Sequence, residues 1–230
     1  MKSDVSVIIP AAGLSLRMGT KIRKPYKTIG KKPIIFYTLE KFYKLKCIKE
    51  IILVVNKKDL TSVVKKWSEK LKGYKVTKII SGGRRRQDSV YNGLCNLTSD
   101  TNIVLIHDAV RPLVNNKIIK SVIEKVEDKG AAIVAVPMKA TVKKVNSNLR
   151  IIKTVPRQNL WMAQTPQGFK RDIITKSYDK IRKTNIEYTD DAEVVEKCGY
   201  TVEIVAGSDD NIKITTREDL KLAESLLKVH

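Results

Sequence analysis

The order of apolar runs along the first 136 residues most constrains the fold of this chain. Short runs, apolar at nearly every position, recur at residues 5–9, 50–55, 76–80, 102–106 and 131–136. A strand that is apolar on both faces is typical of a parallel sheet covered by helices on both sides. The runs therefore predict the buried strands of such a sheet.

The segments between these runs have helical spacing of their apolar residues. The predicted helices span residues 34–44, 60–71, 89–97 and 117–129. Near the C-terminus, Thr215 and Glu218 have capping-box spacing for a last helix that runs to about Lys228. Alternating strands and helices indicate right-handed crossovers. We predict an α/β fold with a doubly wound, mostly parallel, Rossmann-like sheet, whose ligands bind at the carboxyl ends of the strands.

One region departs from this alternation. Residues 141–145 and 149–155 are rich in β-formers and flank the turn sequence Asn146-Ser147-Asn148. A two-stranded hairpin buries little surface by itself. We predict a β-arm at about residues 138–160 that protrudes or packs against a second subunit, within a single domain over residues 1–230.

The net charge of +21 favours an anionic ligand. Nucleic acid is one such ligand, but no run of five or six basic residues occurs and no aromatic residues alternate with the cations. The densest basic clusters, at residues 21–24 and 84–86, lie in glycine-bearing loops that follow predicted strands. This placement favours a small phosphorylated ligand over nucleic acid.

Targeting signals and cysteines add little to the prediction of function. No run reaches the ~18 apolar residues that a membrane span requires, and no signal-peptide pattern follows Met1. We therefore expect a cytoplasmic protein with no membrane partner. Cys47, Cys95 and Cys198 are isolated, which predicts buried free thiols rather than disulfides or a zinc site.

Two glycine-bearing turns are candidate phosphate or base sites. Residues 10–19 combine small side chains with Arg17, and Lys21, Arg23 and Lys24 follow closely. Small residues let backbone N–H groups approach a ligand, although a tight strand-to-helix turn explains them equally well. In the second turn, Gly82 and Gly83 precede Asp88 and Ser89. For Ser89, helix capping and ligand contact remain equally open.

The segment after the run at 102–106 carries a carboxylate among cations. Asp108 at the carboxyl end of a strand suits Mg²⁺ shared with phosphates. The neighbouring His107 is expected to be a hydrogen-bonded structural residue, because magnesium prefers oxygen ligands. Lys213, on a short β-like segment, would read as a surface lysine on its own.

Together these motifs resemble one family, the 2-C-methyl-D-erythritol 4-phosphate cytidylyltransferases of non-mevalonate isoprenoid synthesis. The resemblance covers nearly the whole chain, and its motifs are Ala11-Ala12-Gly13, Arg17-Met18-Gly19, Gly82-Gly83, His107-Asp108-Ala109-Val110-Arg111-Pro112, Gln164-Thr165-Pro166-Gln167-Gly168-Phe169, Thr189-Asp190-Asp191-Ala192 and Asn211-Ile212-Lys213-Ile214-Thr215.

The resemblance implies a role for each matching residue. Transfer of a cytidylyl group from CTP would use Arg17, Lys24, Arg157 and Lys213 as catalytic residues and Asp108 as the Mg²⁺ ligand. The residues implied to bind CTP are Ala11, Ala12, Gly13, Arg17, Lys24, Gly83, Ser89 and Lys213. Those implied to bind methylerythritol phosphate are Arg111, Thr141, Arg157 and Thr165. The family's arm reaches into a partner's site, which implies a homodimer.

Three departures from the family pattern affect these assignments. Ser15 stands where the family often has glycine, a change that is expected to be tolerated. Pro25 follows Lys24 instead of preceding it, which leaves Lys21, Arg23 and Lys24 open as the main phosphate-binding cation. Ala140 replaces the usual aspartate before Thr141, so the arm residues assigned to the acceptor follow the family pattern least closely.

Other functions remain as alternatives. A ribitol 5-phosphate or other polyol-phosphate cytidylyltransferase would share the fold and much of the CTP site, and the motif from Gln164 to Phe169 favours methylerythritol phosphate. A nucleic-acid-binding module would explain the charge alone. A dinucleotide-dependent dehydrogenase is disfavoured, because the first turn lacks G-x-G-x-x-G and no acidic residue ends the second apolar run.

Overall fold

The computed structural model describes residues 4–13 and 23–229, and its main feature is one seven-stranded sheet. The strands, in the order in which they lie across the sheet, are β11 (Glu203–Ala206), β7 (Ala131–Pro137), β10 (Trp161–Lys170), β6 (Ile103–Ile106), β1 (Val5–Ala11), β4 (Ile48–Val55) and β5 (Val76–Ser81). All neighbouring pairs are parallel except those of β10, which is antiparallel to both β6 and β7.

This sheet confirms the predicted fold class and most of the predicted strands. The five apolar runs form β1, β4, β5, β6 and β7 with bounds that differ by one or two residues. Neither β10 nor β11 is among the predicted strands. Gln164, Pro166 and Gly168 lower the strand signal of β10, although this strand lies in the middle of the sheet.

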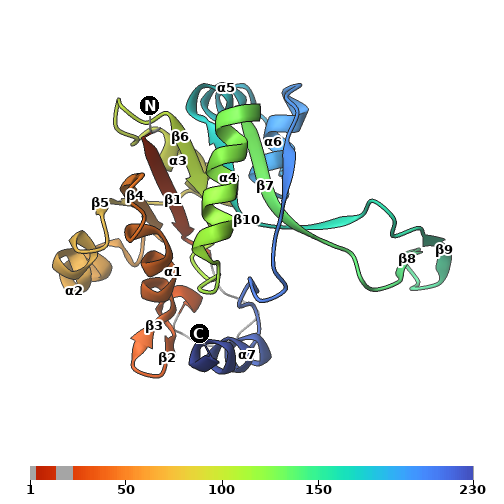
Figure 1. The fold of residues 1–230 in the computed structure, drawn as a ribbon, viewed down its shortest axis with the longest axis horizontal. Coiled ribbons are helices and arrows are strands. Elements are labelled where there is room, and N and C mark those ends of the chain that lie inside the picture. The colour runs from red at the N-terminus through yellow and green to blue at the C-terminus, as the bar shows by residue number, and fades with distance from the viewer. Residues whose placement is uncertain (1–3, 14–22, 230) are drawn as a thin grey trace.

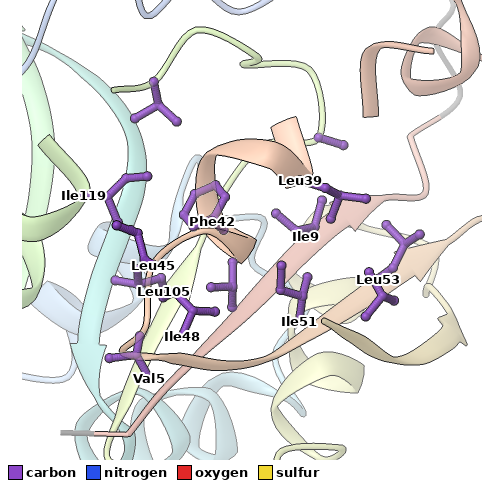
Figure 2. Packing of buried hydrophobic residues seen from close by; sticks show 14 of the residues in the cluster. Val5, Ile9, Leu39, Phe42, Leu45, Ile48, Ile51, Leu53, Leu105 and Ile119 are labelled. Carbon is purple, nitrogen blue, oxygen red and sulfur yellow. The ribbon is translucent and has the colours of Figure 1, made fainter. Parts of the chain in front are cut away.

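Helices cover both faces of the sheet (Figure 1). One face packs against α1 (Ile34–Tyr43), α2 (Leu60–Lys72) and α4 (Asn116–Lys129), and the other packs against α3 (Arg86–Leu94), α5 (Arg171–Ile181) and α6 (Asp191–Lys197). Strand β1 shows why both layers are needed. Val5, Val7 and Ile9 point into the first core, and Ile8 points into the second. Figure 2 shows the first core, where Phe42 and Leu39 of α1 lie over β1 and β4.

Two helix starts differ from the sequence prediction. Helix α3 begins at Arg86, because the Asp88 carboxylate accepts a hydrogen bond from the backbone N–H of Arg85. Helix α7 (Arg217–Val229) begins after Thr216, whose hydroxyl accepts from the N–H of Asp219. Asp219 therefore closes this capping arrangement, not Glu218.

The predicted arm is the segment between β7 and β10. Its strands β8 (Val142–Val145) and β9 (Ile151–Val155) pair with each other, and the hairpin extends far from the central sheet (Figure 1). Smaller elements complete the chain: the 3-10 turn η2 (Lys24–Tyr26), and strands β2 (Thr28–Ile29) and β3 (Lys32–Pro33), which pair in a two-stranded sheet.

No helix in the described part of the chain is long and apolar enough to cross a membrane. The three cysteines are free thiols, as predicted, but they are not uniformly buried. Cys95 is exposed just after α3, and Cys47 and Cys198 are half-buried. The prediction of burial is therefore wrong for Cys95, because this residue follows the last buried turn of a short helix.

Candidate functional site

A cleft of about 590 Å³ opens at the carboxyl ends of β1 and β6. The side chains and backbone that line it come from the loops after β1, β4, β5 and β6, together with η2 and the segment before α7. Eight of the residues predicted for the site lie along this cleft: Ala11, Ala12, Gly13, Lys24, Gly83, Ser89, Asp108 and Lys213. These loops are far apart in sequence, and the order of the strands brings them together.

A larger and more open hollow of about 890 Å³ lies at the opposite edge of the sheet, near the start of β6. Thr101, Asn102 and Asp172 are among its lining residues, and it contains none of the residues predicted for the site. Ligands of doubly wound sheets bind at the carboxyl ends of the strands, so the smaller cleft is the candidate site.

The cations of the first loop are only partly described. Arg17 and Lys21 lie outside the described residues, as does Ser15. Arg23 donates a hydrogen bond from Nε to Asp59 at 2.6 Å, whereas Lys24, the first residue of η2, lines the cleft. Of the two cations described here, Lys24 is therefore the one at the cleft.

The second glycine turn is packed against protein on one side. A Cβ at Gly83 would lie 2.3 Å from Cβ of Asp88, and one at Gly82 would lie 2.5 Å from Cβ of Ala12. Ser89 follows inside α3, where its hydroxyl accepts from the N–H of Gly83 at 3.1 Å. The glycines thus allow the turn to pack against α3 and the β1 loop, and Ser89 secures the turn from within the helix.

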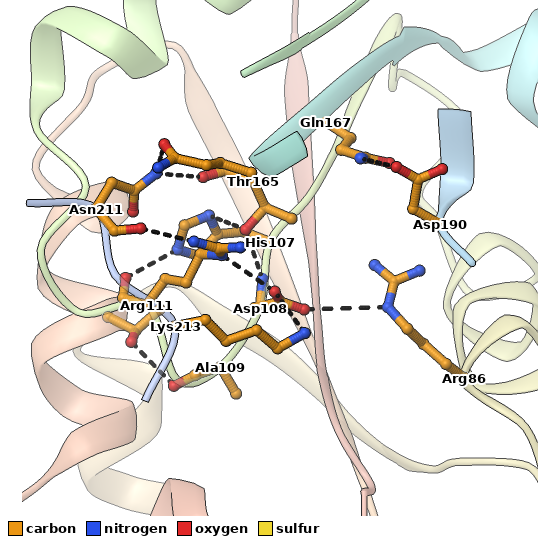
Figure 3. A network of polar contacts seen from close by, with 12 residues as sticks. Arg86, His107, Asp108, Ala109, Arg111, Thr165, Gln167, Asp190, Asn211 and Lys213 are labelled. Carbon is orange, nitrogen blue, oxygen red and sulfur yellow. Dashed lines mark hydrogen bonds and ion pairs between the residues drawn. The ribbon is translucent and has the colours of Figure 1, made fainter. Parts of the chain in front are cut away.

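Asp108 lies among three cations (Figure 3). Its Oδ2 is 3.0 Å from Nζ of Lys213 and 3.2 Å from Nε of Arg111, and its Oδ1 is 4.0 Å from Nε of Arg86. Burial alone would raise the pKa of this carboxyl group, but the three cations lower it well below its usual value. Asp108 is therefore an anion at neutral pH.

A buried chain of hydrogen bonds supports Asp108 from the protein interior (Figure 3). The hydroxyl of Thr165 accepts from the N–H of Asp108 at 3.1 Å and lies 3.0 Å from Nδ1 of His107. On the other side of the ring, Nε2 of His107 is 3.0 Å from the carbonyl oxygen of Arg111. Burial lowers the pKa of His107 to about 4, so the imidazole is neutral at pH 7. The prediction that His107 is a hydrogen-bonded structural residue is confirmed.

A second set of buried contacts holds the segment that carries Lys213. The amide of Asn211 donates to Oε1 of Gln164 at 3.0 Å and to the carbonyl of Thr165 at 2.9 Å. Arg111 donates from Nη1 to the carbonyl of Asn211 at 2.6 Å. The segment is not a strand, contrary to the prediction of a β-like stretch. Contacts with β10 and with Arg111 fix its path instead.

The four residues predicted to bind the acceptor substrate lie outside the cleft lining. Arg111 and Thr165 are buried beneath it, where their polar groups contact other parts of the protein. Thr141 and Arg157 are exposed on the arm, and Arg157 donates to the backbone carbonyl of Lys139. Within one chain, the structure does not bring these two arm residues to the cleft.

The sequence analysis noted Arg86 only as part of a basic cluster, and it did not single out Asp191, the ion-pair partner of Arg86. Arg86 lines the cleft and donates from Nη2 to Oδ2 of the buried Asp191 at 2.7 Å. Asn56, directly after β4, also lines the cleft and donates to the carbonyl of Ala12 at 3.1 Å. The Arg84-Arg85-Arg86 run was the available signal, because it follows a glycine turn.

Comparison with known proteins assigns the chain to a family. Residues 5–229 match the family model described as 2-C-methyl-D-erythritol 4-phosphate cytidylyltransferase. This chain belongs to that family. The family's enzyme from Alkaliphilus oremlandii is 45% identical over 98% of this chain and 96% of its own length, and the one from Syntrophus aciditrophicus is 44% identical over 99% and 97%.

Solved structures of 2-C-methyl-D-erythritol 4-phosphate cytidylyltransferases have the same fold. The 4-diphosphocytidyl-2C-methyl-D-erythritol synthase of Anaerococcus prevotii superposes with a TM-score of 0.85 at 31% identity, covering 99% of this chain and 97% of its own. The cytidylyltransferase of Francisella tularensis gives 0.82 at 32% identity, with 97% and 99% covered. The family resemblance of the sequence motifs is confirmed over essentially the full chain.

Proposed function

We propose that this chain transfers the cytidylyl group of CTP to 2-C-methyl-D-erythritol 4-phosphate, giving CDP-methylerythritol and pyrophosphate in isoprenoid synthesis. The observation that carries the proposal is the convergence of Lys24, Asp108 and Lys213 on one cleft at the carboxyl edge of the sheet. Membership in the cytidylyltransferase family supports the choice of nucleotide and acceptor.

The reaction requires charge control more than proton abstraction. A phosphate oxygen of the acceptor attacks the α-phosphorus of CTP, and the bond from that phosphorus to the pyrophosphate oxygen breaks. The acceptor phosphate is already a competent nucleophile at neutral pH, but both reactants are anions. Catalysis therefore depends on positioning and on fixed cations near the developing charge. Lys24 and Lys213 are such cations in the cleft, and we assign Arg17 to the same task.

The small residues of the cleft suit the nucleoside. We assign Ala11, Ala12, Gly13, Gly83 and Ser89 to the cytosine and ribose. A Cβ at Gly13 would meet no described atom within 4 Å, in contrast to the packed Gly83. Open space at Gly13 supports close approach of a ligand to the backbone of the β1 loop.

Asp108 fits a Mg²⁺ ion that also binds the CTP phosphates. It is an anion, and its Oδ2 contacts Lys213 and Arg111. Among the described residues, no group of three or more His, Cys, Asp or Glu could hold a metal. Magnesium commonly uses one or two carboxylates together with substrate phosphates, so one aspartate suffices. When bound, the ion would neutralise phosphate charge in the cleft.

The acceptor site is proposed to require two subunits. Lys213 lies in the cleft, and Arg111 and Thr165 hold Asp108 and the Lys213 segment beneath it. Thr141 and Arg157 lie on the arm, which we propose reaches the cleft of a second copy in a homodimer. The arm region leaves several large apolar residues exposed, a pattern typical of surfaces that pack against a partner: Val145, Leu149, Ile151, Ile152, Trp161 and Met162.

Pyrophosphate release from CTP and Mg²⁺ tests the proposal directly. Methylerythritol 4-phosphate and ribitol 5-phosphate are offered separately at equal concentration, with a reaction lacking acceptor as the blank. We expect turnover with methylerythritol phosphate and little with ribitol phosphate. Faster turnover of ribitol 5-phosphate would replace the proposed acceptor, and no turnover with either would contradict the enzyme assignment.

A further inference from the structure

The three consecutive arginines after the second glycine turn have different surroundings. Arg85 is bound on several sides: it pairs with Asp88 at 2.7 Å, and its Nη1 donates to the carbonyls of Thr184 at 3.1 Å and Ile186 at 3.2 Å. Arg84 is exposed and lines the cleft. Arg86 also lines the cleft, but its guanidinium is hydrogen-bonded to Asp191, a residue outside the cleft lining.

The group that holds Arg86 is a buried carboxylate. Asp191, the first residue of α6, has no exposed surface, and its Oδ2 accepts from Nη2 of Arg86 at 2.7 Å. Its Oδ1 accepts from the hydroxyl of Tyr178 at 2.6 Å, and its backbone N–H donates to Oε1 of Gln167 at 3.0 Å. Asp191 is thus fixed in place, and it holds the guanidinium of Arg86 at Nη2.

The Nε side of the Arg86 guanidinium faces Asp108 (Figure 3). Its Nε lies 4.0 Å from Oδ1 of Asp108, which is too long for a hydrogen bond, and the Arg86 side chain, which lines the cleft, is 30% exposed. A guanidinium is planar and carries five N–H groups in fixed directions. Holding Nη2 on a rigid carboxylate therefore fixes the directions of the remaining N–H donors of a side chain that lines the cleft.

We propose that Arg86 is a further phosphate-binding residue of the nucleotide site, with Asp191 and Tyr178 as the positioning residues that orient it. Its free donors bind an anionic oxygen of the CTP phosphate chain on the α3 side of Asp108. The inference rests on the proposed cytidylyl transfer and adds a specific cation to that site. Fixed, partly desolvated cations bind phosphate more strongly than mobile surface ones.

A purely structural role makes a different prediction. If Arg86 only neutralised Asp191, its loss would destabilise the fold by leaving a buried charge, and CTP affinity would not depend on it once the buried charge was also removed. The double variant Arg86→Gln with Asp191→Asn removes both charges together. It separates nucleotide binding from the cost of an unpaired carboxylate.

Titration calorimetry of CTP with Mg²⁺, without acceptor, measures the effect on the dissociation constant. We expect the double variant to bind CTP at least about tenfold more weakly than the wild type, as for loss of a charged hydrogen bond. Lys65→Gln removes one positive charge from an exposed position of α2, outside the cleft lining, and is the matched control, with an expected change under about threefold. Tyr178→Phe should weaken CTP binding by a few fold, because Arg86 keeps its charge but its anchor loosens.

Thermal unfolding is recorded for each variant. Unchanged CTP affinity in a folded double variant would overturn the proposal, and so would equal losses in it and in Lys65→Gln. If the double variant does not fold, Arg86→Lys decides: one ammonium cannot serve Asp191 and the cleft together, so weaker CTP binding is expected and normal binding would refute the role. Wild-type turnover with methylerythritol phosphate is measured first, so failure of the proposed function is seen separately.

Discussion

The cleft and the arm are built on opposite principles. In the cleft, polar groups are enclosed and engaged: Asp108 is buried among three cations, and His107 has no exposed surface. On the arm, apolar groups are exposed, with Leu149 at 82% and Ile151 at 63% of their surface. One chain therefore holds these polar groups of the cleft in place, whereas the arm presents a surface that its own chain does not cover.

Their ion pairs differ in the same way. Lys213 and Asp108 pair where the carboxylate is about 10% exposed, and buried contacts fix both residues. At the base of the arm, Lys139 and Asp209 pair with most of both side chains in solvent. Exposed pairs contribute little to stability, because water screens them. The comparison indicates that the cleft is preorganised for charge and that the arm depends on contacts made elsewhere.

The largest expected effect on kcat comes from removing a lysine of the cleft. Lys213→Ala should lower kcat about 100- to 1,000-fold without unfolding the protein, because a fixed cation near the developing charge is lost. Lys24→Ala should have an effect of the same order. Lys144→Ala removes an exposed lysine from β8 and should change kcat by no more than about twofold. Steady-state pyrophosphate release measures all three, and near-normal turnover in either cleft variant would contradict its role.

An intermediate effect concerns stability beneath the cleft. The pKa of His107 is about 4 in the folded chain, below the ordinary value of about 6.5, so the unfolded chain takes up the proton first as the pH falls. Stability is therefore complete above about pH 6.5 and is lost toward pH 4. Between pH 6.5 and 5 the free energy of unfolding should fall by about 2 kcal/mol.

Urea titrations at several pH values measure this loss, with His107→Gln as the comparison. The chain has two histidines, and the other, His230, is its last residue. We expect the variant to have a flatter dependence on pH in this window, whatever its absolute stability. Parallel curves for the two proteins would show that the buried imidazole is not the source.

The smallest expected effect on the fold lies in the arm. Ile151→Lys together with Ile152→Lys should change the free energy of unfolding of the single subunit by no more than about 0.5 kcal/mol per site, since both residues are exposed. Ile8→Ala in the second core is the matched contrast, with an expected loss of about 2 to 5 kcal/mol. Denaturant titration at low protein concentration compares them.

The same arm variant tests self-association. Sedimentation equilibrium should show a dimer for the wild type and single subunits for Ile151→Lys with Ile152→Lys, because two charges would be buried in the proposed interface. A single subunit in both proteins would contradict the homodimer, and an unchanged dimer in the variant would move the interface away from these residues.

The sequence by itself determined five of the parallel strands, the four helices between these strands and the last helix, the arm, and most of the loops that line the cleft. It could do so because burial on both faces and helical spacing are local patterns. Gly83, Ser89 and Asp108 could likewise be found from their place just after predicted strands. Family motifs added roles, and Arg17 lies outside the described residues.

Only the tertiary structure decided which of these residues meet. Arg86 and Asp191 are 105 positions apart, and Thr165 reaches His107 across 58. Both contacts depend on β10 lying antiparallel between β6 and β7, which places Thr165 and Gln167 under the cleft. Local periodicity reports how deeply a residue is buried. The order of strands in the sheet decides its neighbours, and that order arises only when distant segments pack together.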